Sequence, residues 1–140
     1  MPDLLAVAGD KARIAQHHRL AGKPWAEAVD LEPETLITYP VAIERLDVFN
    51  YLLVPANLRP ARHKTIETTD IMLQMVAAGR GVAALPRWLV TEYSERLALV
   101  PVKLGKDGVS KQIFLGRRER EVGVEYMDSF MKLAREVRWR

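Results

Sequence analysis

Apolar and polar positions along the chain predict short strands that alternate with helices. The most informative stretch, residues 65–86, reads TIETTDIMLQMVAAGRGVAALP. Residues 71–78 are apolar on nearly every face, which predicts a helix covered on both sides. Val82 to Leu85 is wholly apolar and typical of a strand buried on both faces. Pro86 is expected to end this strand, because proline cannot donate to the ladder of a sheet.

Turn-forming and capping residues mark the ends of this predicted helix. Thr68, Thr69 and Asp70 are of the types that cap a helix N-terminus. Gly79 falls where a left-handed C-terminal residue is wanted, and Gly81 allows a second tight backbone position before the buried strand. We therefore predict a strand, a helix, a tight glycine turn and a buried strand in this order.

The rest of the chain continues the same alternation. The pattern predicts further strands at residues 4–8, 35–38, 63–67, 97–102 and 111–115. It predicts helical segments at residues 24–30, from Pro40 through Leu53 with Ile43, Leu46, Phe49 and Leu53 facing inward, at 87–94, and at 124–137, the last amphipathic. Strands alternating with helices indicate an α/β layered domain with a largely parallel sheet.

Two predicted helix starts form a candidate ligand site. Each follows a short strand, and free N–H groups at a helix start favour a carboxylate. Open α/β sheets place ligands where helix starts meet at the carboxyl ends of adjacent strands. The candidate ligand-binding residues are Tyr39, Pro40, Val41, Thr68, Thr69 and Asp70. The alternative is that the Thr68–Asp70 group is an ordinary helix cap that needs no ligand.

Composition limits the class of protein further. The chain has 140 residues, 49% of them apolar, no cysteine and a net charge of +3. The absence of cysteine excludes disulfides, thiol nucleophiles and thiolate metal sites. No apolar run reaches the roughly 18–20 residues that span a membrane, and no signal peptide is evident, so we expect a cytoplasmic protein with no membrane partner. The mild positive charge does not amount to a nucleic-acid footprint.

Catalysis and metal binding find no support in the residues. His17 and His18 are adjacent, so they do not face one way on a helix, and we interpret them as part of a solvated loop and not as a metal pair. We find no spacing of nucleophile and base that would support a reaction. The sequence therefore predicts a protein that is not an enzyme and holds no cofactor.

Two motifs resemble one family of proteins. The segment MVAAG followed by GVAALP resembles the signature of the effector-binding domain of LysR-type transcriptional regulators. The strings YPV and RLDV within residues 39–48 are similar to the methionine-biosynthesis regulators of this family. His18 to Ala21 is the nearest match to a turn that the family has near its first strand. The resemblance covers residues 3–135.

The resemblance implies a fold and a domain organisation. The fold is a two-lobed, type II periplasmic-binding-protein-like effector domain, with the second lobe complete and the first lobe only partial. Residues 1–23 would be a crossing strand and loop of lobe one, residues 24–96 lobe two, and residues 97–140 a return to lobe one. The chain is then expected to be a fragment that lacks the DNA-binding helix-turn-helix of the family.

The resemblance also implies a function. The chain would sense a small amino-acid-like carboxylate, with homocysteine as the implied effector, and would form a homo-oligomer, a dimer or tetramer. DNA would be contacted only through the helix-turn-helix domain that this chain lacks. Two alternatives share the fold. One is a solute-binding protein, which the missing signal peptide disfavours. The other is an enzyme such as porphobilinogen deaminase or prephenate dehydratase, whose cysteine or Thr-Arg-Phe motif is absent here.

Overall fold

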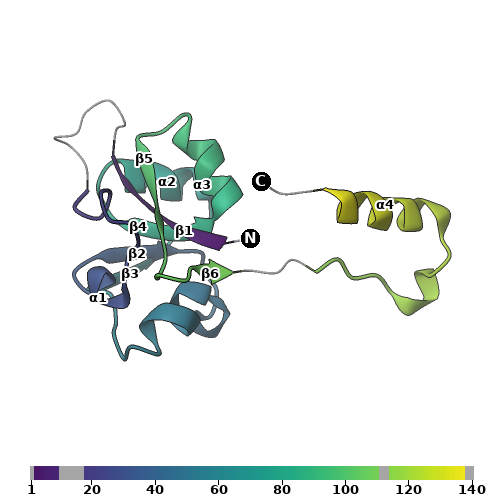
Figure 1. Ribbon diagram of the computed structural model, residues 1–140, viewed down its shortest axis with the longest axis horizontal. Coiled ribbons are helices and arrows are strands. Elements are labelled where there is room, and N and C mark those ends of the chain that lie inside the picture. The colour runs from purple at the N-terminus through teal and green to yellow at the C-terminus, as the bar shows by residue number, and fades with distance from the viewer. Residues whose placement is uncertain (1, 10–17, 111–113, 138–140) are drawn as a thin grey trace.

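The computed structural model describes residues 2–9, 18–110 and 114–137. Its centre is a six-stranded sheet (Figure 1) with the spatial order β3-β2-β4-β1-β5, and β6 pairs with β1 beside β5. The strands are β1 (Pro2–Ala8), β2 (Thr35–Thr38), β3 (Arg62–Thr65), β4 (Val82–Pro86), β5 (Leu99–Lys103) and β6 (Val109–Ser110).

The sheet is mixed, and this corrects the prediction of a largely parallel one. β2 runs parallel to both β3 and β4, and the helical segments between them along the chain supply the crossover connections that parallel pairing requires. β1 runs antiparallel to β4, β5 and β6. The antiparallel half could not be foreseen from the local pattern, because β1 pairs with strands far away along the chain.

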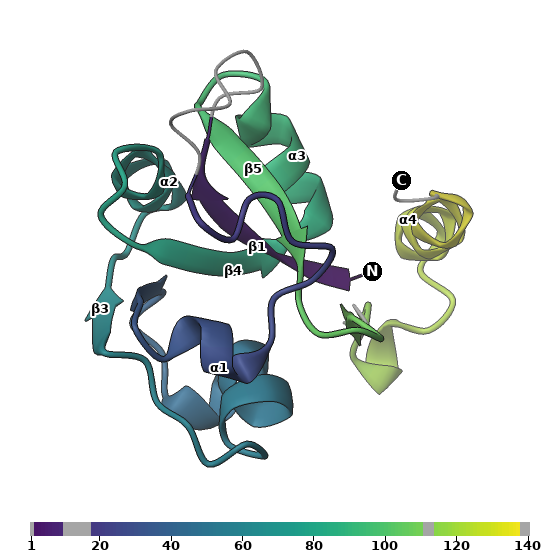
Figure 2. The same cartoon turned by 60° about the vertical axis from the view of Figure 1, so that its left-hand side comes forward.

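Helices cover both faces of the sheet. The helices are α1 (Ala28–Leu31), α2 (Thr69–Ala77), α3 (Arg87–Ser94) and α4 (Glu125–Glu136), with short helical segments η2 (Ile43–Arg45), η3 (Phe49–Leu53) and η4 (Glu119–Glu121). In Figure 2, α2 and α3 lie on one side of the strands and α1 lies on the other.

Alternation along β1 shows how the two faces are filled. Successive strand residues point to opposite faces, and here Leu5 and Val7 pack with α1 and η3, whereas Ala6 packs with α2 and α3. All three side chains are fully buried. The sheet therefore has apolar cores on both faces, and β1 contributes to each.

The stretch from residue 65 to 86 folds as predicted. Gly79 has a φ of 75° after the end of α2, which is the left-handed conformation expected there. Gly81 lies so close to β2 that an added Cβ would stand 2.8 Å from the Thr35 carbonyl oxygen and 2.8 Å from Ile37 Cδ1. Glycine is thus required at the two positions for different reasons. Position 79 needs a left-handed backbone conformation, and position 81 has no space for a side chain.

The predicted helix from Pro40 to Leu53 is wrong in its start and in its continuity, although residues 43–45 and 47–53 are helical. The Val41 N–H instead donates to the Tyr39 carbonyl at 2.8 Å, closing a tight turn, and Ala42 is extended. The segment continues as η2 and the five-residue π-helical η3, in which Phe49 is buried, whereas Ile43 is 43% exposed. The apolar spacing was compatible with one helix, but the tight turn at Pro40 delays the first helical residue to Ile43, and the extended backbone of Leu46 separates η2 from the helical residues that follow.

The other predicted helices are close to those observed. The turn of helix expected over residues 24–30 appears as α1, the helix over 87–94 is α3, and the helix over 124–137 is α4. α4 has no buried residue and lies away from the sheet (Figure 1). No helix of the described residues is long and apolar enough to cross a membrane.

The strand predicted over residues 111–115 is not supported. Residues 111–113 lie outside the described part of the chain, and Phe114 and Leu115 are exposed and not in a strand. β6 lies just before them and pairs with β1. The division into lobes at residues 23 and 96 stays a prediction, and strands on both sides of it belong to the same sheet.

Candidate functional site

A small cavity of about 140 Å³ lies where the ends of three strands meet. β2 and β4 are parallel, so Thr38 and Pro86 end at the same edge of the sheet. β1 is antiparallel to β4, and its Asp3 pairs with Pro86 at that edge. The cavity is lined by Asp3, Thr38, Tyr39, Arg45, Leu46, Asp47, Val48, Ala84, Leu85 and Pro86.

Groups of both charge signs line this cavity. Asp3 is buried, with 6% of its surface exposed, and Asp47 is half-buried. Arg45, at the end of η2, is more exposed. A cavity that offers carboxylates and a guanidinium together suits a small molecule that carries both an ammonium and a carboxylate group.

Two of the residues predicted for the site are brought together beside this cavity. The Tyr39 hydroxyl is hydrogen-bonded to the Thr69 hydroxyl, and this joins the end of β2 to the first turn of α2. Tyr39 also lines the cavity. The link fixes the aromatic ring at the cavity wall, although the two residues are far apart in sequence.

The remaining predicted residues lie elsewhere. Thr68 is the exposed N-cap of α2 and makes no side-chain cap bond. Pro40 and Val41 are exposed, and the Val41 N–H is used within its own turn. Asp70 accepts a hydrogen bond from the Tyr93 hydroxyl of α3. The pair of helix starts that motivated the prediction therefore reduces to one, at α2.

The Asp70–Tyr93 contact has an electrostatic consequence. The hydrogen bond to the Asp70 carboxylate, burial and the Asp70 charge together raise the pKa of the Tyr93 hydroxyl above its ordinary value. The guanidinium of Arg96 lies 4.7 Å from the Tyr93 ring centroid and opposes this shift. Asp70 thus serves to tie α2 to α3.

Asp3, Arg45 and Asp47 were missed from the sequence. Arg45 and Asp47 belong to the RLDV string, which was used as a family signature without regard to its side-chain chemistry. Asp3 carried no local signal, because only the antiparallel pairing of β1 with β4 brings it to this edge.

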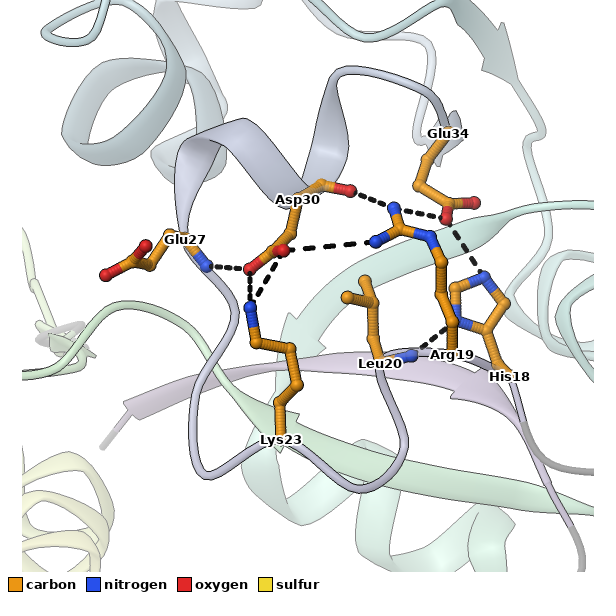
Figure 3. Close-up of polar contacts among 7 residues, drawn as sticks. All are labelled: His18, Arg19, Leu20, Lys23, Glu27, Asp30 and Glu34. Carbon is orange, nitrogen blue, oxygen red and sulfur yellow. Dashed lines mark hydrogen bonds and ion pairs between the residues drawn. The ribbon is translucent and has the colours of Figure 1, made fainter.

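A second polar cluster, on the side of α1, ties the turn at residues 18–23 to α1 and β2 (Figure 3). The Asp30 carboxylate accepts hydrogen bonds from Lys23 Nζ at 2.7 and 2.8 Å and from the Glu27 N–H at 2.8 Å. Arg19 donates to the Asp30 carbonyl and to the Glu34 carboxylate. These bonds hold the turn closed over Leu20, which is fully buried.

His18 completes this cluster. Its Nε2 lies 3.1 Å from the Glu34 carboxylate, and its Nδ1 accepts from the Leu20 N–H at 3.2 Å. The predicted turn at His18–Ala21 is observed, with the Ala21 N–H donating to the His18 carbonyl. His17 lies outside the described residues, and no group of three potential metal ligands occurs among those described. The cluster is thus satisfied internally, which indicates a structural role.

The Asp30 carboxylate should make the stability of the chain depend on pH. Burial raises the pKa of this carboxyl, but the hydrogen bonds from Lys23 and Glu27 and the charges of Lys23 and Arg19 outweigh burial and lower it. The stabilisation is therefore present above the unfolded-state pKa and is lost as pH falls through the lower folded-state pKa. Urea unfolding of Asp30→Asn should show a deficit near neutral pH that shrinks below about pH 4.

The matched control is Asp107→Asn, which removes an exposed carboxylate in the turn between β5 and β6. This variant should track the parent at every pH. A deficit in Asp30→Asn that stayed constant from pH 7 to pH 3 would show that the ionised carboxylate does not stabilise the turn.

Comparison with known proteins identifies relatives of the chain. A family model described as the LysR substrate binding domain matches residues 12–139. The HTH-type transcriptional regulator MetR of Escherichia coli (strain K12) is 38% identical over 122 residues, which are 87% of this chain and 38% of that protein. The MetR of Haemophilus influenzae is 34% identical over 116 residues, 83% of this chain and 37% of that protein. The chain thus spans less than two-fifths of the length of these relatives.

Solved structures give the same picture. The regulatory domain of MetR, a LysR family regulator from N. meningitidis, superposes with a TM-score of 0.81 at 34% identity, covering 96% of this chain and 59% of that one. The BenM effector binding domain with its effector benzoate matches with a TM-score of 0.58 at 19% identity, over 99% of this chain and 63% of that one. The second match supports the fold alone.

Proposed function

The chain belongs to the LysR substrate-binding domain family, and from this premise we propose that it senses a small amino acid in the cavity at the ends of β1, β2 and β4. We propose homocysteine as this effector, on the similarity to MetR regulators. The observation that carries the proposal is that Asp3, Asp47 and Arg45 line one cavity.

The position and size of the cavity agree with this role. Ligands of open α/β sheets bind outside the carboxyl ends of the parallel strands, and the cavity lies at the ends of β2 and β4. Drug-sized ligands occupy roughly 300–1,000 Å³, whereas this cavity has about 140 Å³. It has room for a small amino acid but not for a nucleotide.

Each polar residue has a distinct part in the proposal. Arg45 receives the carboxylate of the effector, and Asp3 and Asp47 face its ammonium group. Tyr39 forms an aromatic wall that the hydrogen bond to Thr69 holds in place. The thiol-bearing side chain of homocysteine would contact apolar residues of the lining such as Leu46 and Val48.

The consequence for regulation follows from linkage. An effector can shift a regulator between two conformations only if it binds one of them more tightly. In the proposal the amino acid bridges residues from β1, β2 and η2, so it favours the arrangement in which these elements are closest. The longer regulator would pass this change to a homo-oligomer, a dimer or tetramer, and to DNA through a helix-turn-helix domain.

Titration of the chain with homocysteine, followed by two-dimensional NMR of the amide groups, tests the proposal. The parent should show saturable shifts at residues 38–48, and Arg45→Ala should weaken binding by at least about tenfold, because a hydrogen bond between charged groups is lost. Tyr39→Phe should weaken it less. Arg80→Ala is the matched control, since Arg80 is also exposed but lies in the turn after α2.

Three outcomes separate the parts of the proposal. Unchanged binding in Arg45→Ala would reject the site. Equal affinity for methionine or cysteine would reject homocysteine as the specific effector and leave the site standing. No saturable shift with any amino acid would reject amino-acid sensing by this chain.

A further inference from the structure

A second cavity, of about 450 Å³, lies on the other side of the segment that contains η2 and η3. Its floor and walls come from η2, η3, the turn at residues 54–60 and the edge strand β3. In Figure 2, β3 lies at the edge of the sheet, on the side opposite α4. Ile43 and Phe49 line this cavity, whereas the residues between them, 45–48, line the first cavity.

The walls of this second cavity are mainly apolar. Phe49 is buried and packs at a tilt against the His63 ring, with 5.2 Å between the ring centroids. Ile43 and Val54 also line the cavity, yet they are 43% and 61% exposed. Single exposed apolar side chains are ordinary, but several around one cavity indicate a surface that a ligand can cover.

The rim of the cavity carries a guanidinium. Arg59 lines it beside the His63 imidazole, whereas Arg62 and Lys64, one position before and after His63 in β3, point to the opposite face of the sheet. None of the ion pairs among the described residues involves Arg59. Positive charge without a carboxylate partner, beside an apolar hollow, favours a ligand that supplies the anion itself.

A hydrogen bond to the neighbouring strand β2 holds the His63 side chain in position. Its Nε2 lies 2.6 Å from the Thr38 hydroxyl, and that hydroxyl donates to the Tyr39 carbonyl at 3.1 Å. The hydrogen bond between the Thr38 hydroxyl and His63 Nε2 ties the imidazole to the end of β2. This bond keeps the imidazole against Phe49 and the cavity open at the β3 edge.

We propose that this second cavity binds a small organic anion with an apolar body, of the aryl or branched-alkyl carboxylate class. The apolar body would pack against Phe49, Ile43 and Val54. The carboxylate would lie at Arg59, with His63 beside it. This site is separate from the amino-acid site proposed above and does not depend on it, because the wall formed by residues 43–49 lies between the two.

Three probes, each titrated into the whole chain and followed by amide NMR, test the proposal. Phenylacetate carries both the apolar body and the charge, phenylacetamide only the body, and acetate only the charge. Phenylacetate should give saturable shifts centred on residues 54–63. The other two probes should bind at least about tenfold more weakly, because each lacks one of the two contributions.

Two pairs of variants localise the binding. Arg59→Ala should weaken phenylacetate binding about tenfold or more, whereas Arg80→Ala, which removes another exposed guanidinium far along the chain, should not change it. Ile43→Glu places a carboxylate at the cavity mouth and should abolish binding. Ile71→Glu, on an isoleucine of α2 that is 54% exposed, should leave it intact.

These experiments test the second cavity independently of whether homocysteine binds in the first. Equal binding of phenylacetate and phenylacetamide, unchanged binding in both Arg59→Ala and Ile43→Glu, or shifts centred on residues 38–48 would each overturn it. Absence of saturable binding up to about 10 mM, a Kd near the weak end of specific recognition, would overturn it as well.

Discussion

Replacing Leu73 with alanine should lower the free energy of unfolding by about 2–5 kcal/mol. Leu73 is fully buried in α2 and packs in the core between α2, α3 and the sheet. The substitution removes apolar contacts and leaves a cavity that the close-packed core fills only in part. Urea unfolding monitored by circular dichroism gives the change directly. For a domain of this size, such a loss is a large share of the total stability.

The control for this prediction is Leu133→Ala in α4. Leu133 is 62% exposed, and α4 has no buried residue, so the change should stay within about 0.5 kcal/mol. Comparable losses in the two variants would mean that α4 is covered in solution by contacts which the described chain does not make.

Replacing Gly81 with alanine should destabilise the fold by about 1–3 kcal/mol, the usual cost of overpacking. The added Cβ would lie 2.8 Å from the Thr35 carbonyl oxygen, which is backbone and cannot rotate away. The strands β2 and β4 would therefore have to move apart, and Ile37, whose Cδ1 would also lie 2.8 Å from the added Cβ, would have to shift as well. Thermal unfolding should show a clear fall in Tm.

Gly22→Ala is the matched substitution in open space. An added Cβ at Gly22 meets no atom within 4 Å, so the folded state should tolerate it. Because alanine also lowers the conformational entropy of the unfolded chain, the substitution should be neutral or slightly stabilising. Gly81→Ala should thus lower the free energy of unfolding, whereas Gly22→Ala should leave it unchanged or raise it slightly. If Gly81→Ala were as stable as the parent, lack of space for a side chain would not be the reason for glycine at position 81.

The sequence was most informative where the signals were local. The segment from residue 65 to 86 combined an apolar helix, a left-handed glycine, a close-contact glycine and a buried strand, and each is observed. The resemblance to LysR-type regulators, read from the same segment, is confirmed by the family match and by the MetR relatives. The type II periplasmic-binding-protein-like fold class is confirmed by the structural matches.

The failures came where distant residues or a single turn decide the outcome. The spacing of Ile43, Leu46, Phe49 and Leu53 fits a helix, yet the tight turn at Tyr39–Val41 delays its start and the extended Leu46 divides it. Periodicity reports which faces are apolar, and it does not report whether the first turn can form. The helix start expected at Pro40 is therefore absent.

The candidate site was predictable only in part, for a related reason. Tyr39 was found because it ends a strand, and Thr69 because it begins a helix. Their mutual hydrogen bond, and the presence of Asp3 in the same cavity, depend on how strands far apart in sequence are ordered in the sheet. No local pattern specifies that order.

The central position of β1 has a consequence for how the chain folds. Leu4 pairs with Lys103 on one side and with Leu85 on the other. These partners of Leu4 lie in β5 and β4, far along the chain from β1. Such non-local pairing slows folding, because a long loop must close before the contact forms. During synthesis the apolar β1 must wait until most of the chain has left the ribosome. Over that interval Leu5, Ala6 and Val7, buried in the finished sheet, are open to aggregation or to a chaperone.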